Sequence, residues 1–215
     1  MSACLLFDCD GTLVDSERLG HVGLVRKFQP LGIDLDADEL MMRFKGWKLG
    51  RILEILESEH DLALPKDFVP GYRAIVSELF DAELKPIEGI EQALADLPQP
   101  KAVVSNGPPQ KIKQALSLCG LSSYFGDNIY SAYDVGIWKP DPDIYRHAAA
   151  EMGYSPEQCS VIDDGNVGVE AGHLAGMTTY FYNRFRESCD FPNVISFESM
   201  HSLPELVRTN GSRPH

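Results

Sequence analysis

The chain has 215 residues, of which 44% are hydrophobic, and a formal net charge of -13. This composition is typical of a folded globular protein, and the acidic balance argues against nucleic-acid binding, which requires a basic face. No apolar run is long enough to span a membrane, no secretory signal is visible and the five cysteines form no CxxC pair, so we expect a cytoplasmic protein without a membrane partner.

Residues 4–7 form a short apolar run that predicts a buried strand. The run leads directly into Asp8 and Asp10, which are followed by Gly11 and Thr12. Two carboxylates this close repel one another unless a cation lies between them, and open α/β sheets bind ligands at the carboxyl ends of their strands. The two aspartates are therefore either turn residues or the start of a Mg²⁺ site with a carboxylate nucleophile. The groups that follow favour the second interpretation.

The segment after the first strand carries the apolar periodicity of helices and contains no convincing strand. The predicted helices run from Ser16 and Glu17 to Phe28, and then cover residues 37–44, 49–60 and 67–79. We therefore expect an all-helical insertion at residues 16–83.

From Pro86 onwards, helical and strand patterns alternate along the chain. The predicted helices cover residues 89–97, 109–118, 142–152, 167–175 and 202–207, and the predicted strands cover 102–104, 128–130, 160–162, 178–182 and 194–195. Such alternation predicts a parallel sheet with helices on both faces, a Rossmann-like α/β core to which the first strand also belongs. The core would comprise residues 1–15 and 84–215.

Polar groups also follow two further predicted strands, and one loop contains a lysine. Ser105 and Asn106 follow the second predicted strand, Asp163 and Asp164 follow strand 160–162, and Lys139 lies between two such segments in a proline-rich loop. If these groups converge, they supply hard oxygen ligands for Mg²⁺ and donors for phosphate oxygens, as phosphoryl transfer through a phospho-aspartate requires. The alternatives are a turn-capping serine, a solvated lysine and two helix-capping aspartates.

The order Asp-x-Asp-Gly-Thr, Ser-Asn, Lys-Pro and Asp-Asp resembles the haloacid dehalogenase superfamily of phosphohydrolases. The helical insertion directly after the first motif resembles that of its β-phosphoglucomutase-like group, whose members carry a small helical cap. The similarity spans nearly the whole chain. It implies a Rossmann-like catalytic core, residues 1–15 and 84–215, and a cap, residues 16–83.

The resemblance also implies a role for each acidic residue. Asp8 would attack the phosphorus, and Asp10 would protonate the leaving oxygen and then activate water. The Asp8 carboxylate, the main-chain carbonyl of Asp10 and Asp164 would bind Mg²⁺, with Asp163 supporting the metal shell. Many relatives have serine where this chain has Gly165, so a hydroxyl that stabilises the metal site is missing here.

The same resemblance assigns phosphate binding to Ser105 and Lys139, with Asn106 assisting. In the cap, Arg43 and Lys45 lie beside a glycine at the end of a predicted helix. Either these two basic residues lie in solvent at the end of the helix, where positive charge is favourable, or they bind the anionic or polyhydroxy end of the substrate.

The expected function is a Mg²⁺-dependent phosphatase for a small phosphorylated metabolite, a sugar or sugar-acid phosphate such as 6-phosphogluconate, acting as a monomer. One alternative is a hexose-phosphate mutase, although such mutases typically carry valine where this chain has Thr12. Another is a phosphate-binding protein without catalytic activity, an alternative that remains because Gly165 replaces the serine of many relatives. A hydrolytic dehalogenase is disfavoured because those relatives lack the aspartate at the position of Asp10.

Overall fold

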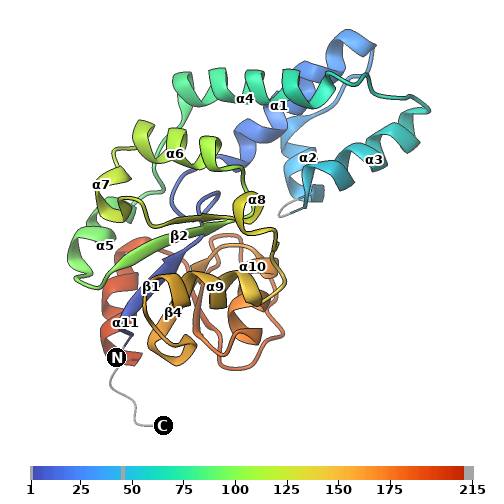
Figure 1. Cartoon of the computed structure of the whole chain (residues 1–215). Helices are drawn as coiled ribbons and strands as arrows, with labels where there is room; N and C mark the ends of the chain where they lie inside the picture. Colours follow the sequence, from blue (N-terminus) through green and yellow to red (C-terminus); the bar gives the residue numbers. More distant parts are fainter. Residues whose placement is uncertain (1, 45–46, 211–215) are drawn as a thin grey trace. The chain divides into compact units, whose positions relative to one another are not determined.

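The computed structural model describes residues 2–44 and 47–210 (Figure 1). The chain divides into two compact units, of which the first combines Met1–Asp15 with Lys85–His215 and the second is Ser16–Leu84. Within the described residues, none of the helices combines the length and the apolar character needed to cross a membrane.

The first unit is built on one parallel sheet, in which the described residues form six strands in the order β3-β2-β1-β4-β5-β6. The strands are β1 Cys4–Phe7, β2 Lys101–Ser105, β3 Ile129–Ser131, β4 Cys159–Asp163, β5 Thr178–Tyr182 and β6 Ile195–Phe197. Phe7 on β1 lies opposite Val103 on β2 and Ile162 on β4. The predicted strands are confirmed, with small differences at their ends. The three central strands end at the same edge of the sheet.

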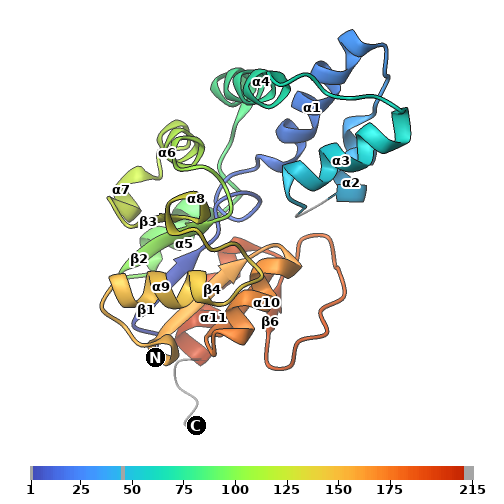
Figure 2. The ribbon, with the colours of Figure 1, turned by 45° about the vertical axis from the view of Figure 1, so that its right-hand side comes forward.

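Helices cover both faces of this sheet, as predicted (Figures 1 and 2). They are α5 Ile90–Asp96, α6 Pro109–Leu118, α7 Ser122–Phe125, α8 Ala132–Val135, α9 Asp143–Glu151, α10 Asn166–Leu174 and α11 Leu203–Asn210. Leu6 of β1 joins the apolar cluster formed with α9 and α10. Its neighbour Phe7 points to the other face, where its ring packs edge-on against Phe125 of α7 at 6.0 Å. This alternation explains why β1 is apolar throughout.

The sequence pattern does not predict α7 and α8, because four residues are too few to show a helical period. α8 follows β3 directly, and Ser131 caps it by accepting a hydrogen bond from the Tyr133 backbone N–H at 3.1 Å. α7 leads the chain into β3, whereas α8 follows β3 and so lies at the edge of the sheet where the polar groups gather.

The second unit is helical throughout its described residues: α1 Glu17–Phe28, a 3₁₀ turn Gln29–Leu31, α2 Ala37–Phe44, α3 Leu49–His60 and α4 Phe68–Glu83. It has its own apolar core, in which the rings of Phe28 and Phe68 pack at 5.0 Å. α1 and α4 pack closely at Gly23, where an added methyl group would lie 2.6 Å from Val76 Cγ2. A separate core is expected of a segment inserted between two elements of another domain.

Candidate active site

The first motif forms a tight turn after β1. The Asp8 backbone N–H donates to the Ile162 carbonyl at 2.9 Å and so extends the ladder between β1 and β4. Gly11 then takes a φ of 82°, a conformation that favours glycine. An added methyl group at Gly11 would lie 2.3 Å from Asp164 Oδ2, so the turn packs directly against that carboxylate. The glycine therefore allows the first and last acidic motifs to come together.

Three aspartates from two strand ends meet at this edge of the sheet. One carboxylate oxygen from each of Asp8, Asp163 and Asp164 lies within 4.8 Å of the others. Asp163 and Asp164 are each only 3% exposed. Thr12 donates its hydroxyl to Asp164 Oδ1 at 2.9 Å, and the Gly165 N–H donates to Asp163 Oδ1 at 2.9 Å. Gly165 directly precedes α10, so Asp163 contacts the start of that helix, while Asp164 packs against the turn of the first motif.

Lys139 lies among these carboxylates rather than in solvent. Its side chain is buried, and its Nζ lies 2.6 Å from Asp8 Oδ1 and 2.8 Å from Asp163 Oδ2. The Tyr145 hydroxyl of α9 also donates to Asp163 Oδ2 at 2.8 Å, and its ring lies 5.1 Å below the lysine ammonium. The alternative of a solvated lysine is therefore wrong.

Asn106 contacts the backbone of the lysine loop. The Lys139 N–H donates to Asn106 Oδ1 at 2.9 Å, and Asn106 Nδ2 donates to the Lys139 carbonyl at 3.3 Å. Ser105 is buried, and its Oγ accepts the Gly107 N–H at 3.0 Å, which is the turn-capping contact that the sequence left open. The Ser105 hydroxyl retains a proton that it can donate to an oxyanion.

The charges at this edge do not balance. Burial raises the pKa of Asp8 to about 7, against the influence of Lys139 and reinforced by Asp163 and Asp10. Burial lowers the pKa of Lys139, but Asp163 and Asp8 outweigh it, so that pKa lies well above its ordinary value. Three buried carboxylates around one ammonium leave an excess of negative charge and of hard oxygen ligands. This donor set fits a divalent cation such as Mg²⁺.

The structure adds one residue that the sequence analysis did not assign. Lys111 in the first turn of α6 places its Nζ 2.8 Å from Asp10 Oδ1. The sequence position of Lys111 could have indicated this role, because α6 begins directly after the Ser105–Gly107 turn and therefore at the same edge of the sheet.

The cap residues lie in the second unit, which is described here by itself. Arg43 at the end of α2 donates from Nη1 to Glu59 Oε2 of α3 at 2.9 Å and from Nη2 to Glu59 Oε1, and its guanidinium lies 4.5 Å from the centre of the Phe44 ring. Lys45 lies outside the described residues.

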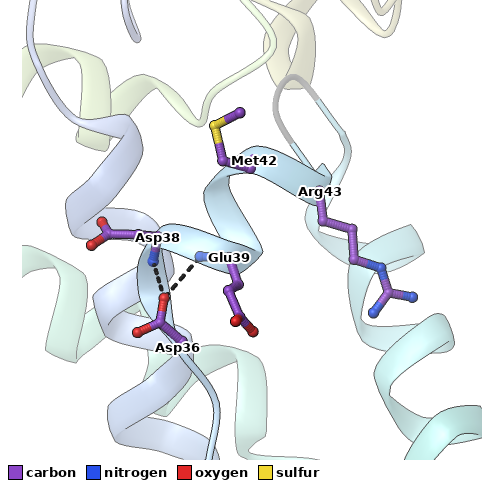
Figure 3. Close-up of a pocket in the computed structure, with 5 residues that line it drawn as sticks. All are labelled: Asp36, Asp38, Glu39, Met42 and Arg43. Atoms are coloured by element: carbon purple, nitrogen blue, oxygen red, sulfur yellow. Dashed lines mark hydrogen bonds between the residues drawn. The ribbon is translucent and has the colours of Figure 1, made fainter.

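A shallow pocket in the second unit includes Arg43 in its lining. Figure 3 shows its lining, which consists of Asp36, Asp38, Glu39, Met42 and Arg43. Asp36 Oδ1 accepts the backbone N–H groups of Asp38 and Glu39 at 2.9 Å and so caps α2. Three carboxylates and one arginine give the pocket lining a net negative charge.

Gly168 of α10 provides a test of the acidic cluster. An added methyl group there would lie 1.8 Å from Asp163 Oδ2, the oxygen that contacts Lys139 and Tyr145. We expect Gly168→Ala to displace that carboxylate, to lower the free energy of unfolding by about 1–3 kcal/mol through overpacking, and to lower activity. Chemical denaturation measures the first effect.

Gly50→Ala is the matched control, because Gly50 is also helical but has no atom within 4 Å of the added methyl group. Helix propensity should make this variant equal to or more stable than the wild type. Equal stability and activity in Gly168→Ala and the wild type would show that Asp163 does not lie as described.

Comparisons with known proteins show which family and which solved structures the chain is similar to. A family model described as haloacid dehalogenase-like hydrolase matches residues 3–176. The 6-phosphogluconate phosphatase of Escherichia coli K12 is 40% identical over 210 residues, which cover 96% of this chain and 95% of that protein. A HAD family hydrolase from Deinococcus radiodurans R1, solved with bound phosphate and sodium, is 28% identical, with a TM-score of 0.79 over 97% of this chain and 96% of that one. A haloacid dehalogenase-like protein of unknown function from Agrobacterium tumefaciens C58 is 29% identical, with a TM-score of 0.85 over 99% of this chain and 100% of that one.

Proposed function

The chain belongs to the haloacid dehalogenase-like hydrolases and is a phosphatase of that family, and we propose that it hydrolyses a sugar or sugar-acid phosphate such as 6-phosphogluconate through a phospho-aspartate. One observation carries the chemistry: the Asp8 carboxylate lies beside a buried ammonium and two further buried carboxylates at the end of β1. A carboxylate in such a setting can act as a nucleophile towards phosphorus.

In the first half of the reaction, an Asp8 oxygen attacks the phosphorus and the bond from phosphorus to the ester oxygen breaks. Asp10 gives its proton to that departing oxygen, so the sugar leaves as a neutral alcohol. Lys139 and Ser105 donate hydrogen bonds to the oxygens of the phosphoryl group, where negative charge must be stabilised. Asn106 holds the loop that carries the lysine.

In the second half, water attacks the phosphorus of the aspartyl-phosphate. Asp10, now ionised, takes the proton from this water, and the bond from phosphorus to the Asp8 oxygen breaks. Inorganic phosphate is released, and both aspartates return to their starting protonation states. One residue therefore acts first as the acid and then as the base.

The fit of the acidic cluster to a divalent cation supports Mg²⁺ as the cofactor. The Asp8 and Asp164 carboxylates and the main-chain carbonyl of Asp10 would hold it, and Asp163 would support this shell. Bound there, Mg²⁺ would offset the charge of the carboxylates and of the phosphoryl oxygens. Gly165 offers no hydroxyl to this shell, so we expect the metal to be held less tightly than in relatives with serine at that position.

We expect activity to require Mg²⁺, to vanish in excess EDTA and to be inhibited by Ca²⁺. Ca²⁺ accepts more ligands at longer distances than Mg²⁺, so it can engage a second Asp8 oxygen and remove the nucleophile. Phosphate release from 6-phosphogluconate with each ion measures the effect on activity. Binding is measured separately by the shift in melting temperature of the phosphate-free protein. Full activity in EDTA would contradict the metal site.

The substrate proposal rests on the 40% identity to a 6-phosphogluconate phosphatase. A panel of sugar and sugar-acid phosphates tests it, with phosphate release as the readout. We expect a higher kcat/KM for 6-phosphogluconate than for hexose phosphates, whose sugar part carries no carboxylate. Formation of an isomeric sugar phosphate without free phosphate would instead identify a mutase, and no release from any substrate would identify a silent phosphate-binding protein.

We propose that residues 16–83 act as a cap joined to the core through Asp15–Ser16 and Ala82–Leu84, and that its Arg43 and Lys45 bind the part of the substrate distant from phosphorus. Closure of such a cap would exclude water from the phosphoryl site. The support is the position of a helical insertion directly after the motif that contains the nucleophile.

We expect Arg43→Ala to lower kcat/KM for 6-phosphogluconate by about tenfold or more, equivalent to about 1.4 kcal/mol, and to leave acetyl phosphate hydrolysis nearly unchanged. Two controls separate substrate binding from cap stability. Glu59→Gln removes the charge that Arg43 contacts but keeps the arginine, and Arg51→Ala removes an exposed arginine that pairs with Glu54. Equal losses in all three variants, or on both substrates, would contradict recognition by Arg43.

A further inference from the structure

The ion pair between Lys111 and Asp10 joins α6 to the first motif. Lys111 Nζ lies 2.8 Å from Asp10 Oδ1, and the two side chains are 33% and 27% exposed. Ion pairs with this exposure contribute little to folding. The pair nevertheless fixes one oxygen of a carboxylate whose terminal torsion is otherwise broad and nearly two-fold. The main effect of this ion pair is therefore to orient the Asp10 carboxylate.

The other Asp10 oxygen faces the turn that follows β2. A methyl group built on Gly107 would lie 3.4 Å from Asp10 Oδ2 and 3.3 Å from Ser105 Oγ, so both oxygens border the same point. With Oδ1 held by Lys111, Oδ2 lies beside Gly107, in the turn that also carries the proposed phosphate-binding hydroxyl.

The buried lysine of the site cannot supply this contact. Lys139 Nζ is already engaged by Asp8 and Asp163, and its backbone is held by Asn106. Lys111 reaches Asp10 from another element, α6, whose start is fixed by the same Ser105–Gly107 turn. The turn therefore places the proposed phosphate-binding hydroxyl and the lysine that orients Asp10 on consecutive segments.

We propose that Lys111 is a positioning residue for Asp10, which holds Oδ1 so that Oδ2 is the oxygen that exchanges protons with the leaving group and with water. This proposal rests on the proposed function, because it assumes that Asp10 is the acid and base of the reaction. Transfer of a proton requires the donor oxygen within hydrogen-bond reach of the reacting atom, so a change in the orientation of the Asp10 carboxylate lowers the rate.

The test compares Lys111→Met, Lys111→Arg and the control Lys113→Met, which removes the same charge from an exposed position on the same helix. With 6-phosphogluconate, Lys111→Met should lower kcat by about tenfold or more and leave KM within about twofold, because the loss falls on proton transfer. Lys111→Arg should recover most of that loss, since a guanidinium can also donate to Oδ1. Lys113→Met should match the wild type.

A second substrate gives a signature that a structural role would not produce. The nitrophenolate of p-nitrophenyl phosphate leaves without a proton, whereas activation of water still needs Asp10. Lys111→Met should therefore show a rapid burst of about one nitrophenolate per active site, followed by slow turnover as the phosphoenzyme accumulates. Acid quenching of labelled enzyme measures that intermediate directly.

Three results would overturn the assignment. A raised KM for 6-phosphogluconate with unchanged kcat would make Lys111 a substrate-binding residue. Kinetics equal to those of Lys113→Met would make it a surface lysine, and a lower kcat without phosphoenzyme accumulation would exclude its action through Asp10. Failure of the wild type to hydrolyse any phosphate ester in Mg²⁺ would overturn the proposed function itself, and the wild-type assay separates that outcome from the other three.

Discussion

Asp8→Asn should abolish turnover while the protein stays folded. The amide has nearly the same size as the carboxylate but is a poor nucleophile, and it removes one negative ligand from the proposed metal site. We expect residual activity below about one percent, as befits the loss of a covalent nucleophile. Single-turnover experiments with labelled substrate should detect no phosphoenzyme.

The same substitution should not weaken the metal-free fold at neutral pH. Burial raises the pKa of Asp8 from 3.8 to about 7, so the folded chain binds a proton at this site more tightly than the unfolded chain does. Ionisation of Asp8 therefore costs stability as the pH rises from about 4 to about 7, and asparagine removes that dependence. The stability of Asp8→Asn relative to the wild type should increase across this range.

Thermal unfolding in EDTA at pH 5 and at pH 7.5 measures this difference. The control is Asp134→Asn, which removes an exposed carboxylate from α8 in the same unit. Turnover of Asp8→Asn above about one percent of the wild type would contradict the nucleophile assignment. A relative stability that falls with rising pH would contradict the buried, charge-crowded setting of Asp8.

The sheet was predictable from the sequence because its strands are short, apolar and bounded by polar groups. β1, β2 and β4 are buried at every position, so their apolar residues are consecutive rather than alternating, as in residues 102–104 and 161–162. The carboxylates were recognisable because charged residues directly after buried strands are unusual, and the lysine because it lies between Trp138 and Pro140 in a proline-rich loop. The helical unit was predictable from its apolar period, although α4 continues to Glu83, beyond the predicted end at Leu79.

The contacts between motifs were not predictable in this way. The position of Lys111 over Asp10 depends on how α6 leaves the Ser105–Gly107 turn, and the Tyr145 contact depends on how α9 packs beneath the lysine loop. The order of the elements places Lys111 at the correct edge of the sheet, but it does not predict which carboxylate its ammonium contacts. The sequence also suggested that Asn106 assists phosphate binding, whereas its two polar atoms both contact the Lys139 backbone.

Lys139→Met should affect both folding and catalysis strongly. The substitution leaves two buried carboxylates, Asp8 and Asp163, without their ammonium partner. Removal of one partner from a buried ion pair costs about 3–5 kcal/mol of stability, and Mg²⁺ should restore part of this loss if it binds the same carboxylates. Loss of one preorganised donor to the phosphoryl oxygens should lower kcat by about 10² to 10³. Denaturation with and without Mg²⁺, and single-turnover kinetics, measure the two effects.

Asn106→Ala tests whether catalysis depends on how the lysine is held. If the asparagine acts through the Lys139 backbone, its removal should lower kcat in the wild type but have little further effect in Lys139→Met, because the group that it positions is already gone. If it contacts phosphate directly, the two losses should multiply. Asn128→Ala is the matched control, since Asn128 Nδ2 also contacts a backbone carbonyl, that of Lys101 at 3.4 Å, at the other end of β2. Independent, multiplying losses would show that Asn106 binds substrate rather than the lysine loop.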